Sequence, residues 1–105
     1  MITFYIPFYN EEKRGNIYPF LSELSKFINK KINQNNYFIL INDGSADKTK
    51  IILEQFVKKL NNKNIVFLSN KTNKGVGFSF RKALEICKTK FIIPVPSDND
   101  IPILD

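Results

Sequence analysis

The stretch YFILINDGS, residues Tyr37 to Ser45, decides the fold of this 105-residue chain. It begins with five consecutive apolar residues, which is typical of a strand buried on both faces. The polar residues from Asn42 onward follow directly, and their sequence favours a tight turn and the start of a helix. We therefore expect a buried parallel strand that turns into a helix, as in α/β proteins.

Three other runs have the length and the β-branched or aromatic content of a strand: Ile2–Ile6, Ile65–Leu68 and Phe91–Val95. Longer stretches with apolar residues at three- and four-residue steps lie between the four runs, which indicates helices. Strand and helix therefore alternate along the chain, and this order predicts a parallel sheet with helices on both faces. We assign the chain to the α/β class, as a Rossmann-like three-layer αβα fold with a mainly parallel sheet.

Each helical stretch has bounds that the sequence suggests. The apolar face of the first is expected to extend over Ile17–Ile32. The second is expected to span about Asp47–Leu60, with Ser45 or its first residue as the N-cap. The third is expected to begin near Gly75 and to end near Lys90, where lysines favour the negative end of the helix dipole.

Composition excludes several kinds of chemistry. The chain has no histidine, which rules out a Ser-His-Asp triad, a Cys-His pair and a His-ligated zinc ion. The single cysteine, Cys87, cannot form an internal disulfide, which fits a reducing compartment. Its place on the apolar face of the third helix predicts a small buried hydrophobe. The length favours a single domain over residues 1–105.

The net charge of +6 invites three interpretations: nucleic acid, an anionic membrane or phosphate-bearing substrates. Almost all of the positive charge comes from scattered lysines, and the only arginines are Arg14 and Arg81. Surfaces that bind nucleic acid usually combine arginine with interleaved aromatic residues. We therefore expect a solvated lysine-rich surface and no nucleic-acid partner.

Polar loops follow the predicted strands, and ligands of parallel sheets bind at the carboxyl ends of the strands. Two of these loops carry acids directly at a strand end, Asp43 after the second strand and Asp98 after the fourth. Each motif alone has a structural explanation as a turn or a helix cap. Gly75 and Gly77 open a helix, but the third glycine of a dinucleotide fingerprint is missing, so NAD binding is disfavoured.

Taken in order, three motifs resemble family 2 glycosyltransferases, the GT-A-fold enzymes that use nucleotide sugars. Ile6–Glu12, IPFYNEE, is similar to the family's I-P-x-Y-N-E-E opening. Ile41–Thr49, INDGSADKT, is similar to its V-D-D-G-S-x-D-x-T turn. Asn73–Gly77, NKGVG, with Arg81 one helical turn later, is similar to its N-x-G-x-G helix start. The branch with dolichyl- and undecaprenyl-phosphate sugar transferases is the most similar.

The resemblance implies a binding site for a nucleotide-diphosphate sugar. Its residues would be Pro7, Tyr9, Glu11 and Asp43 around the base and ribose, and Asn73, Gly75 and Arg81 nearer the nucleotide and its phosphates. The resemblance also implies a D-x-D motif that holds Mg²⁺ or Mn²⁺ on the diphosphate. Asp98-Asn99-Asp100 spells that motif directly, whereas a gap-free count from Asn73 places its two acids on Pro96 and Asp98. Asp98 and Asp100 are therefore the metal candidates.

Two features depart from the family pattern. The first acid of the turn motif is Asn42 in this chain, which leaves Asp43 as the one acid of the pair. Pro94 and Pro96 fall in or beside a strand that we expect to be central, where proline removes a ladder hydrogen bond. That strand is expected to end early or to bulge.

The resemblance implies a metal-dependent transferase that moves a sugar from a nucleotide-diphosphate sugar to a glycan or lipid phosphate, with inversion. Family members continue beyond this point with the acceptor site and the catalytic carboxylate, so we expect a donor-binding portion that is inactive alone and name no general base. Self-association through the truncated face is also expected. The alternative is a non-catalytic α/β module that binds a nucleotide or an anion. We expect a cytoplasmic protein, at the inner face of a membrane when full-length.

Overall fold

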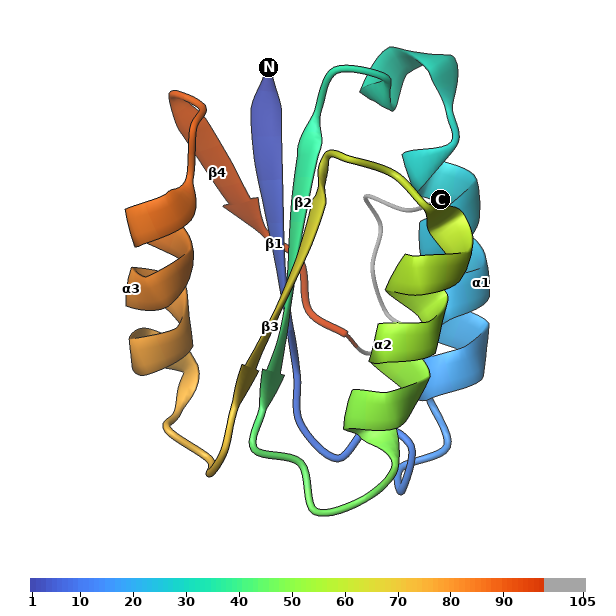
Figure 1. Ribbon diagram of the computed structural model, residues 1–105, viewed down its shortest axis with the longest axis vertical. Coiled ribbons are helices and arrows are strands. Elements are labelled where there is room, and N and C mark those ends of the chain that lie inside the picture. The colour runs from blue at the N-terminus through green and yellow to red at the C-terminus, as the bar shows by residue number, and fades with distance from the viewer. Residues whose placement is uncertain (98–105) are drawn as a thin grey trace.

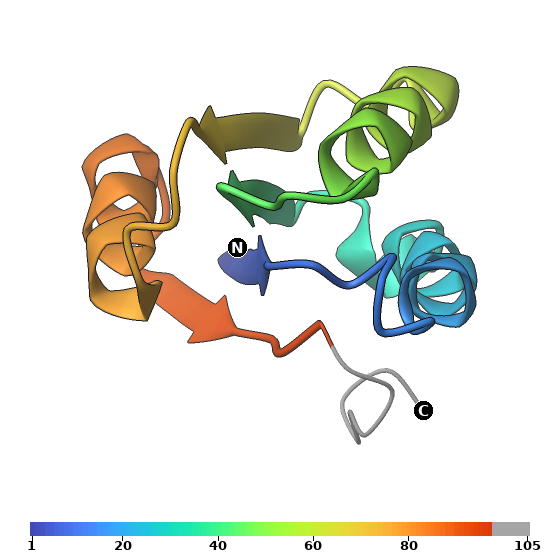
Figure 2. The same ribbon diagram turned by 90° about the horizontal axis from the view of Figure 1, so that it is seen from below.

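Four parallel strands form the centre of the structure, a computed structural model that describes residues 1–97. The strands are β1 (Ile2–Phe8), β2 (Tyr37–Asp43), β3 (Ile65–Asn70) and β4 (Phe91–Pro94). They lie in the order β3-β2-β1-β4, which Figure 2 shows as a stack seen along the strands. All carboxyl ends therefore meet at one edge of the sheet, the lower edge in Figure 1.

Helices cover both faces of this sheet. Helices α1 (Ile17–Ile28) and α2 (Thr49–Leu60) lie on one face, and α3 (Val76–Ile86) lies on the other (Figure 2). A short 3₁₀ turn, η1 (Lys31–Asn33), follows α1. The predicted three-layer αβα arrangement with a parallel sheet is confirmed. None of the helices within residues 1–97 is long and apolar enough to cross a bilayer.

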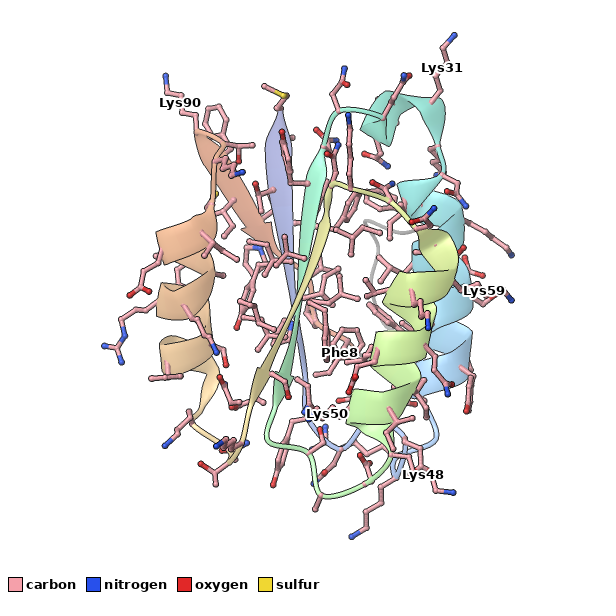
Figure 3. The ribbon with its side chains drawn as sticks, in the orientation of Figure 1. Phe8, Lys31, Lys48, Lys50, Lys59 and Lys90 are labelled. Atoms are coloured by element: carbon pink, nitrogen blue, oxygen red, sulfur yellow. The ribbon has the colours of Figure 1, made fainter. Side chains whose placement is uncertain are left out.

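Strand alternation divides the apolar residues between two cores. On the side of α1 and α2, the buried side chains of Phe4, Ile6 and Phe8 continue one core from β1 into the helices. The ring of Phe8 meets that of Phe20 edge to face, with 5.6 Å between their centroids (Figure 3). On the opposite side, Tyr5 packs with α3 in a smaller core. The two cores hold the sheet rigidly beneath its polar edge.

Helix α1 is shorter than expected, and the prediction for Ile32 is wrong. The helix ends at Ile28, and the Ile32 side chain is 84% exposed. The buried residue of the 3₁₀ turn is Asn33, whose amide nitrogen donates to the carbonyl oxygen of Phe27 at 2.6 Å. The carbonyl of Phe27 also accepts from the N–H of Lys30 at 3.2 Å, so the Asn33 side chain adds a second hydrogen bond at the helix end.

The fourth strand ends early, as its prolines suggest. The prediction that it is a central strand is wrong for the sheet that residues 1–97 form. Strand β4 pairs only with β1, so it is an edge strand of the described sheet. Its last residue, Pro94, lies opposite Tyr5, and the ladder continues with the N–H of Val95 donating to the carbonyl of Tyr5 at 2.8 Å. An edge position tolerates a residue without an N–H donor.

Cys87 is not the buried helix residue that its sequence position suggested. It lies just beyond α3 and is only partly buried, with its thiol donating to the carbonyl of Thr89 at 3.5 Å. Burial would raise the pKa of the thiol, but hydrogen bonds with Thr3 and Thr89 outweigh that effect and lower the pKa.

Candidate functional site

The candidate site lies at the carboxyl edge of the sheet, where the loops after β1, β2 and β3 come together (Figure 1). The exposed residues Lys48 and Lys50 lie at this same end of the molecule (Figure 3). Parallel α/β sheets bind ligands at this edge because the helix N-termini also point there.

Hydrogen bonds join the loop after β1 to the loop after β2. The backbone N–H of Asn10 donates to the Ser45 hydroxyl at 2.9 Å, and the side-chain oxygen of Asn10 accepts from the N–H of Ala46 at 2.8 Å. Asn10 adopts a left-handed conformation with φ +52°, which asparagine tolerates well. The two loops therefore form one unit, although 35 residues separate Asn10 from Ser45.

Asp47 extends this junction to the start of α2. Its carboxylate accepts from the N–H of Thr49 at 3.0 Å and from the N–H of Lys13 at 2.8 Å. Burial would raise the pKa of Asp47, but the hydrogen bonds from Thr49 and Lys13 outweigh it and lower the pKa. The prediction of Ser45 or Asp47 as the N-cap of α2 is wrong, because the N-cap is Lys48. Asp47 precedes it and bonds Thr49, while Ser45 bonds Asn10.

The carboxylate of Asp43, the last residue of β2, organises the third loop. One carboxylate oxygen accepts from the N–H of Lys74 at 2.8 Å and the other from the N–H of Gly75 at 3.0 Å. The side-chain amide of Asn73 donates to the carbonyl of Asp43 at 3.4 Å. Gly75 has φ +90°, a conformation that glycine adopts at no steric cost. The structure thus places the predicted residues Asp43, Asn73 and Gly75 in direct contact.

A pocket of about 240 Å³ opens between these loops. Its lining comes from three strand ends and from helix α3: Pro7, Phe8, Tyr9, Glu11, Arg14, Asp43, Ser79, Pro96 and Ser97. Four of the residues predicted from the family resemblance, Pro7, Tyr9, Glu11 and Asp43, therefore share one cavity. The predicted base and ribose residues lie close together in space.

Glu11 presents an unsatisfied carboxylate oxygen in the wall of this pocket. Its side chain is 6% exposed, and one oxygen pairs with the Arg14 guanidinium at 3.3 Å. The other oxygen, Oε2, is buried and has no hydrogen-bond partner among residues 1–97. A buried acceptor without a partner is costly, and functional sites commonly retain such groups. This oxygen can accept a hydrogen bond from a ligand hydroxyl or contact a cation.

The two arginines of the chain have different positions relative to the pocket. Arg14 lies in its lining, whereas Arg81 lies exposed on α3 and is not a lining residue. The structure therefore does not bring the predicted Arg81 to this cavity. Sequence reasoning missed Arg14 and Ser79, and the only available signal for Arg14 was its position directly after the Tyr9–Glu12 motif.

Asn42, which replaces the first acid of the family's turn motif, has a structural role. Its side-chain amide donates to the hydroxyl of Ser69 on β3 at 3.0 Å, and the residue is 2% exposed. An aspartate cannot donate in that bond. The side chain of Asn42 points to the α1 and α2 side of the sheet and that of Asp43 to the α3 side, because neighbouring strand residues alternate.

The predicted metal ligands Asp98 and Asp100 lie outside the described residues. The last described residue, Ser97, lines the pocket, so the chain enters the predicted metal motif from the pocket wall. Residues 1–97 contain no group of three or more acidic or cysteine side chains that could hold a metal ion. Of the two acids that line the pocket, Asp43 accepts at Oδ2 from the N–H of Gly75, and Glu11 Oε2 has no hydrogen-bond partner among residues 1–97.

A second and wider groove, of about 620 Å³, lies between α1 and α2. Its lining includes Tyr18, Leu21, Phe56 and Leu60, and its only charged side chain is Lys59. Its lining within residues 1–97 contains no acid. The smaller pocket is therefore the better candidate site, because it joins the polar strand ends to acceptor groups.

Comparison with known proteins identifies the family of the chain. The sequence profile described as glycosyl transferase family 2 matches residues 3–102. A dolichyl-phosphate beta-glucosyltransferase from Dictyostelium discoideum is 30% identical over 97 residues, which cover 89% of this chain and 29% of that protein. The chain thus spans less than a third of that relative's length.

Solved structures show the same fold. The S. aureus protein TarS, in a crystal structure with UDP, has 28% identity and a TM-score of 0.70 over 92% of this chain and 27% of that one. A mannosyltransferase from Pyrobaculum calidifontis, in complex with GDP-Man and Mn²⁺, has 14% identity and a TM-score of 0.76 over the same shares. The parallel sheet, the loops at its carboxyl edge and the profile match together show that this chain belongs to glycosyl transferase family 2 and has the GT-A type of fold.

Proposed function

We propose that this chain forms the donor-binding part of an enzyme that transfers a sugar from a nucleoside-diphosphate sugar. The observation that carries the proposal is the pocket of about 240 Å³, in which Asp43 and Glu11 present carboxylate oxygens beside Tyr9. Such oxygens accept hydrogen bonds from base N–H groups and ribose hydroxyls. The 28% identical TarS was solved with UDP, which supports a nucleotide as the ligand of the corresponding edge.

Positive charge around the pocket fits the diphosphate. Arg14 lines the cavity, and the exposed Lys48 and Lys50 lie at the same end of the molecule (Figure 3). The backbone N–H groups of Lys74 and Gly75 are bonded to Asp43, so they hold the acid and not a phosphate. We therefore assign the phosphates to the Arg14 side of the pocket.

The proposal includes a divalent cation, Mg²⁺ or Mn²⁺, on Asp98 and Asp100. A bound cation supplies Lewis-acid stabilisation of the negative charge that develops on the leaving diphosphate. In the transfer itself, an acceptor oxygen forms a bond to the sugar carbon while the bond from that carbon to the diphosphate breaks, which inverts the configuration. Residues 1–97 contribute the walls that bind and orient the donor for this step.

The acceptor we propose is a lipid phosphate or a glycan. The Dictyostelium relative, named as a dolichyl-phosphate beta-glucosyltransferase, supports the lipid phosphate. We also propose a cytoplasmic location at the inner face of a membrane, which the single unpaired Cys87 supports, since free thiols persist in reducing compartments.

Titration calorimetry of the purified protein with UDP-glucose and GDP-mannose, each with and without Mn²⁺, tests the donor site. We expect saturable binding of at least one of these nucleotides, with tighter binding when Mn²⁺ is present. Asp43→Ala removes the acid that holds the third loop and is expected to abolish binding. The variant Lys59→Ala, in the groove between α1 and α2, serves as the control and is expected to bind normally. Absence of binding by the unmodified protein would overturn the proposal.

Nucleotide binding without sugar transfer, in a form of the protein that includes any acceptor region, would instead favour the non-catalytic module. Transfer is measured with radiolabelled donor and a short polyprenyl phosphate, and with a glycan acceptor in parallel. The product that forms identifies the acceptor class.

A further inference from the structure

Asn70, the last residue of β3, is buried against the acid that organises the candidate site. It is 7% exposed and lies opposite Asp43 in the strand register. Its side-chain nitrogen donates to Asp43 Oδ1 at 2.9 Å and to the Ser79 hydroxyl at 3.1 Å. Its side-chain oxygen accepts from the ammonium group of Lys82 at 3.1 Å. The family resemblance did not point to Asn70, Ser79 or Lys82.

These three contacts allow one orientation of the Asn70 amide. A carboxylate only accepts and an ammonium group only donates, so the nitrogen must face Asp43 and the oxygen must face Lys82. Both amide hydrogens are then in use, and the amide cannot rotate without losing a charge-assisted hydrogen bond. Lys82, from the second turn of α3, therefore determines which way Asn70 presents its donors.

The network also determines what Asp43 and Ser79 can offer to a ligand. Asp43 Oδ1 accepts from both Asn70 and the N–H of Lys74, whereas Oδ2 accepts only from the N–H of Gly75. Oδ2 therefore keeps a free lone pair. The Ser79 oxygen accepts from Asn70, and its hydroxyl lies beside that of Tyr5, where it opposes the rise in the Tyr5 pKa that burial causes. Both side chains line the pocket.

We propose that Asn70, anchored by Lys82, is a positioning residue that fixes Asp43 as an acceptor toward the bound nucleotide. A preformed acceptor binds a ligand at lower entropic cost than a group that must first be ordered. This inference rests on the proposed nucleotide site.

The first test compares Lys82→Met with Lys59→Met. Each variant loses one helix lysine and one unit of charge, but only Lys82 contacts Asn70, and Lys59 lies on α2, on the other side of the sheet (Figure 3). The affinity for UDP and GDP is measured by calorimetry well below the melting temperature, so that the folded protein alone is compared. Loss of the anchor is expected to weaken nucleotide binding about three- to tenfold, since a hydrogen bond from a charged donor is lost. Lys59→Met is expected to bind within about twofold of the unmodified protein.

The second test compares Asn70→Asp with Asn42→Asp. Both variants replace an amide by an isosteric carboxylate in neighbouring rungs of β2 and β3, but only the first removes the donors to Asp43 and Ser79. Asn70→Asp is expected to weaken nucleotide binding about tenfold or more at pH 7.5, because two carboxylates then face each other. Asn42→Asp is expected to bind within about threefold, since its side chain lies on the opposite face of the sheet.

Acidification separates positioning from simple misfolding. In Asn70→Asp a proton shared by the two carboxylates restores a donor between them, so binding is expected to recover toward pH 5 relative to the unmodified protein at the same pH. The charged groups near this pair include Lys82 from α3, and Glu11 and Arg14, which line the same pocket as Asp43. Each variant is therefore compared with the unmodified protein at the same pH.

The outcomes distinguish the inference from the function on which it rests. If the unmodified protein binds neither nucleotide, both fail. If the unmodified protein binds a nucleotide and both Lys82→Met and Asn70→Asp bind it with the same affinity as the unmodified protein, only the positioning role is overturned. A lower melting temperature with unchanged affinity in both variants would likewise show that Asn70 is merely structural.

Discussion

The backbone of Gly44 lies directly against the backbone of Thr72. A Cβ atom on Gly44 would lie 2.6 Å from the carbonyl oxygen of Thr72 and would overlap the peptide unit that joins Thr72 to Asn73. Gly44 also has φ +67°, in the left-handed region. The glycine therefore lets the loop after β3 close onto Asp43, whose carboxylate then accepts from Lys74 and Gly75.

Gly44→Ala is expected to destabilise the protein by about 3 kcal/mol or more, because steric overlap adds to left-handed backbone strain. The matched control is Gly15→Ala. Gly15 has φ +77° but no atom within 4 Å of the added Cβ, so only strain of about 1 kcal/mol is expected. Urea unfolding measures both variants. Equal losses of unfolding free energy in the two variants would show that the contact with Thr72 does not affect stability.

Asp47→Ala is expected to lower the free energy of unfolding by about 1 kcal/mol at pH 7, because its carboxylate accepts from the N–H groups of Thr49 and Lys13. Since the pKa of Asp47 is lowered on folding, its ionised form stabilises the protein above the ordinary value of 3.8. That contribution is lost as the pH falls through the lowered pKa. The difference between the two proteins, followed by thermal unfolding from pH 7 to pH 3, should therefore shrink only below about pH 4. A constant difference would contradict this role of the charge.

Glu11→Gln is expected to weaken nucleotide binding about tenfold while leaving stability unchanged or raising it by up to about 1 kcal/mol. The reason is that Oε2 of Glu11 is buried without a partner among residues 1–97, and the ion pair lost at Oε1 is weak because the Arg14 side chain is 60% exposed. Calorimetric titration with UDP and GDP and a melting curve measure the two effects. A loss of stability with normal affinity would mean that Glu11 serves the fold alone.

Arg14→Ala is expected to reduce nucleotide affinity about tenfold, since Arg14 lines the pocket. Arg81→Ala removes the same charge from an exposed position on α3 that does not line it, and is expected to bind within about twofold. The pair is measured by the same titration at equal ionic strength. A larger effect at Arg81 would favour the phosphate role that the family resemblance implies.

Asn33→Ala is expected to cost about 1 kcal/mol, because the carbonyl of Phe27 loses the hydrogen bond from the Asn33 side chain but keeps the one from the N–H of Lys30. Ile32→Ser, at the neighbouring exposed residue, is expected to change stability by less than about 0.5 kcal/mol. Chemical denaturation compares the two. A larger cost for Ile32→Ser would restore the interpretation that the apolar face of α1 extends to that residue.

Local patterns predicted most of the fold. The apolar run that begins at Tyr37 and the turn after it appear as β2 and the loop into α2, and the alternation of elements predicted the parallel sheet. The strand ends were harder to predict, because Asn42 and Asp43 have the composition of a turn. They belong to β2 because they pair with Ser69 and Asn70 in the neighbouring strand.

Part of the candidate site also followed from the sequence. Motif order located Pro7, Tyr9, Glu11 and Asp43, which the structure brings to one pocket. The sequence could not place Arg14 in that pocket and Arg81 outside it, because each arginine lies a few residues after one of the motifs. Arg14 follows Ile6–Glu12, and Arg81 follows Asn73–Gly77.

By itself, the sequence determined the α/β class, the order of the elements and the edge of the sheet at which the polar loops meet. The class and the order of the elements follow from hydrophobic periodicity, which is a property of a few neighbouring residues. The edge follows from the geometry of parallel strands, whose carboxyl ends lie together. Two features depend on the tertiary structure alone. Asn70 and Lys82 orient Asp43, and residue 44 must be glycine because a Cβ atom there would overlap the backbone of Thr72. Those contacts join residues that are 12 to 28 positions apart, so they exist only after strands and helices have packed.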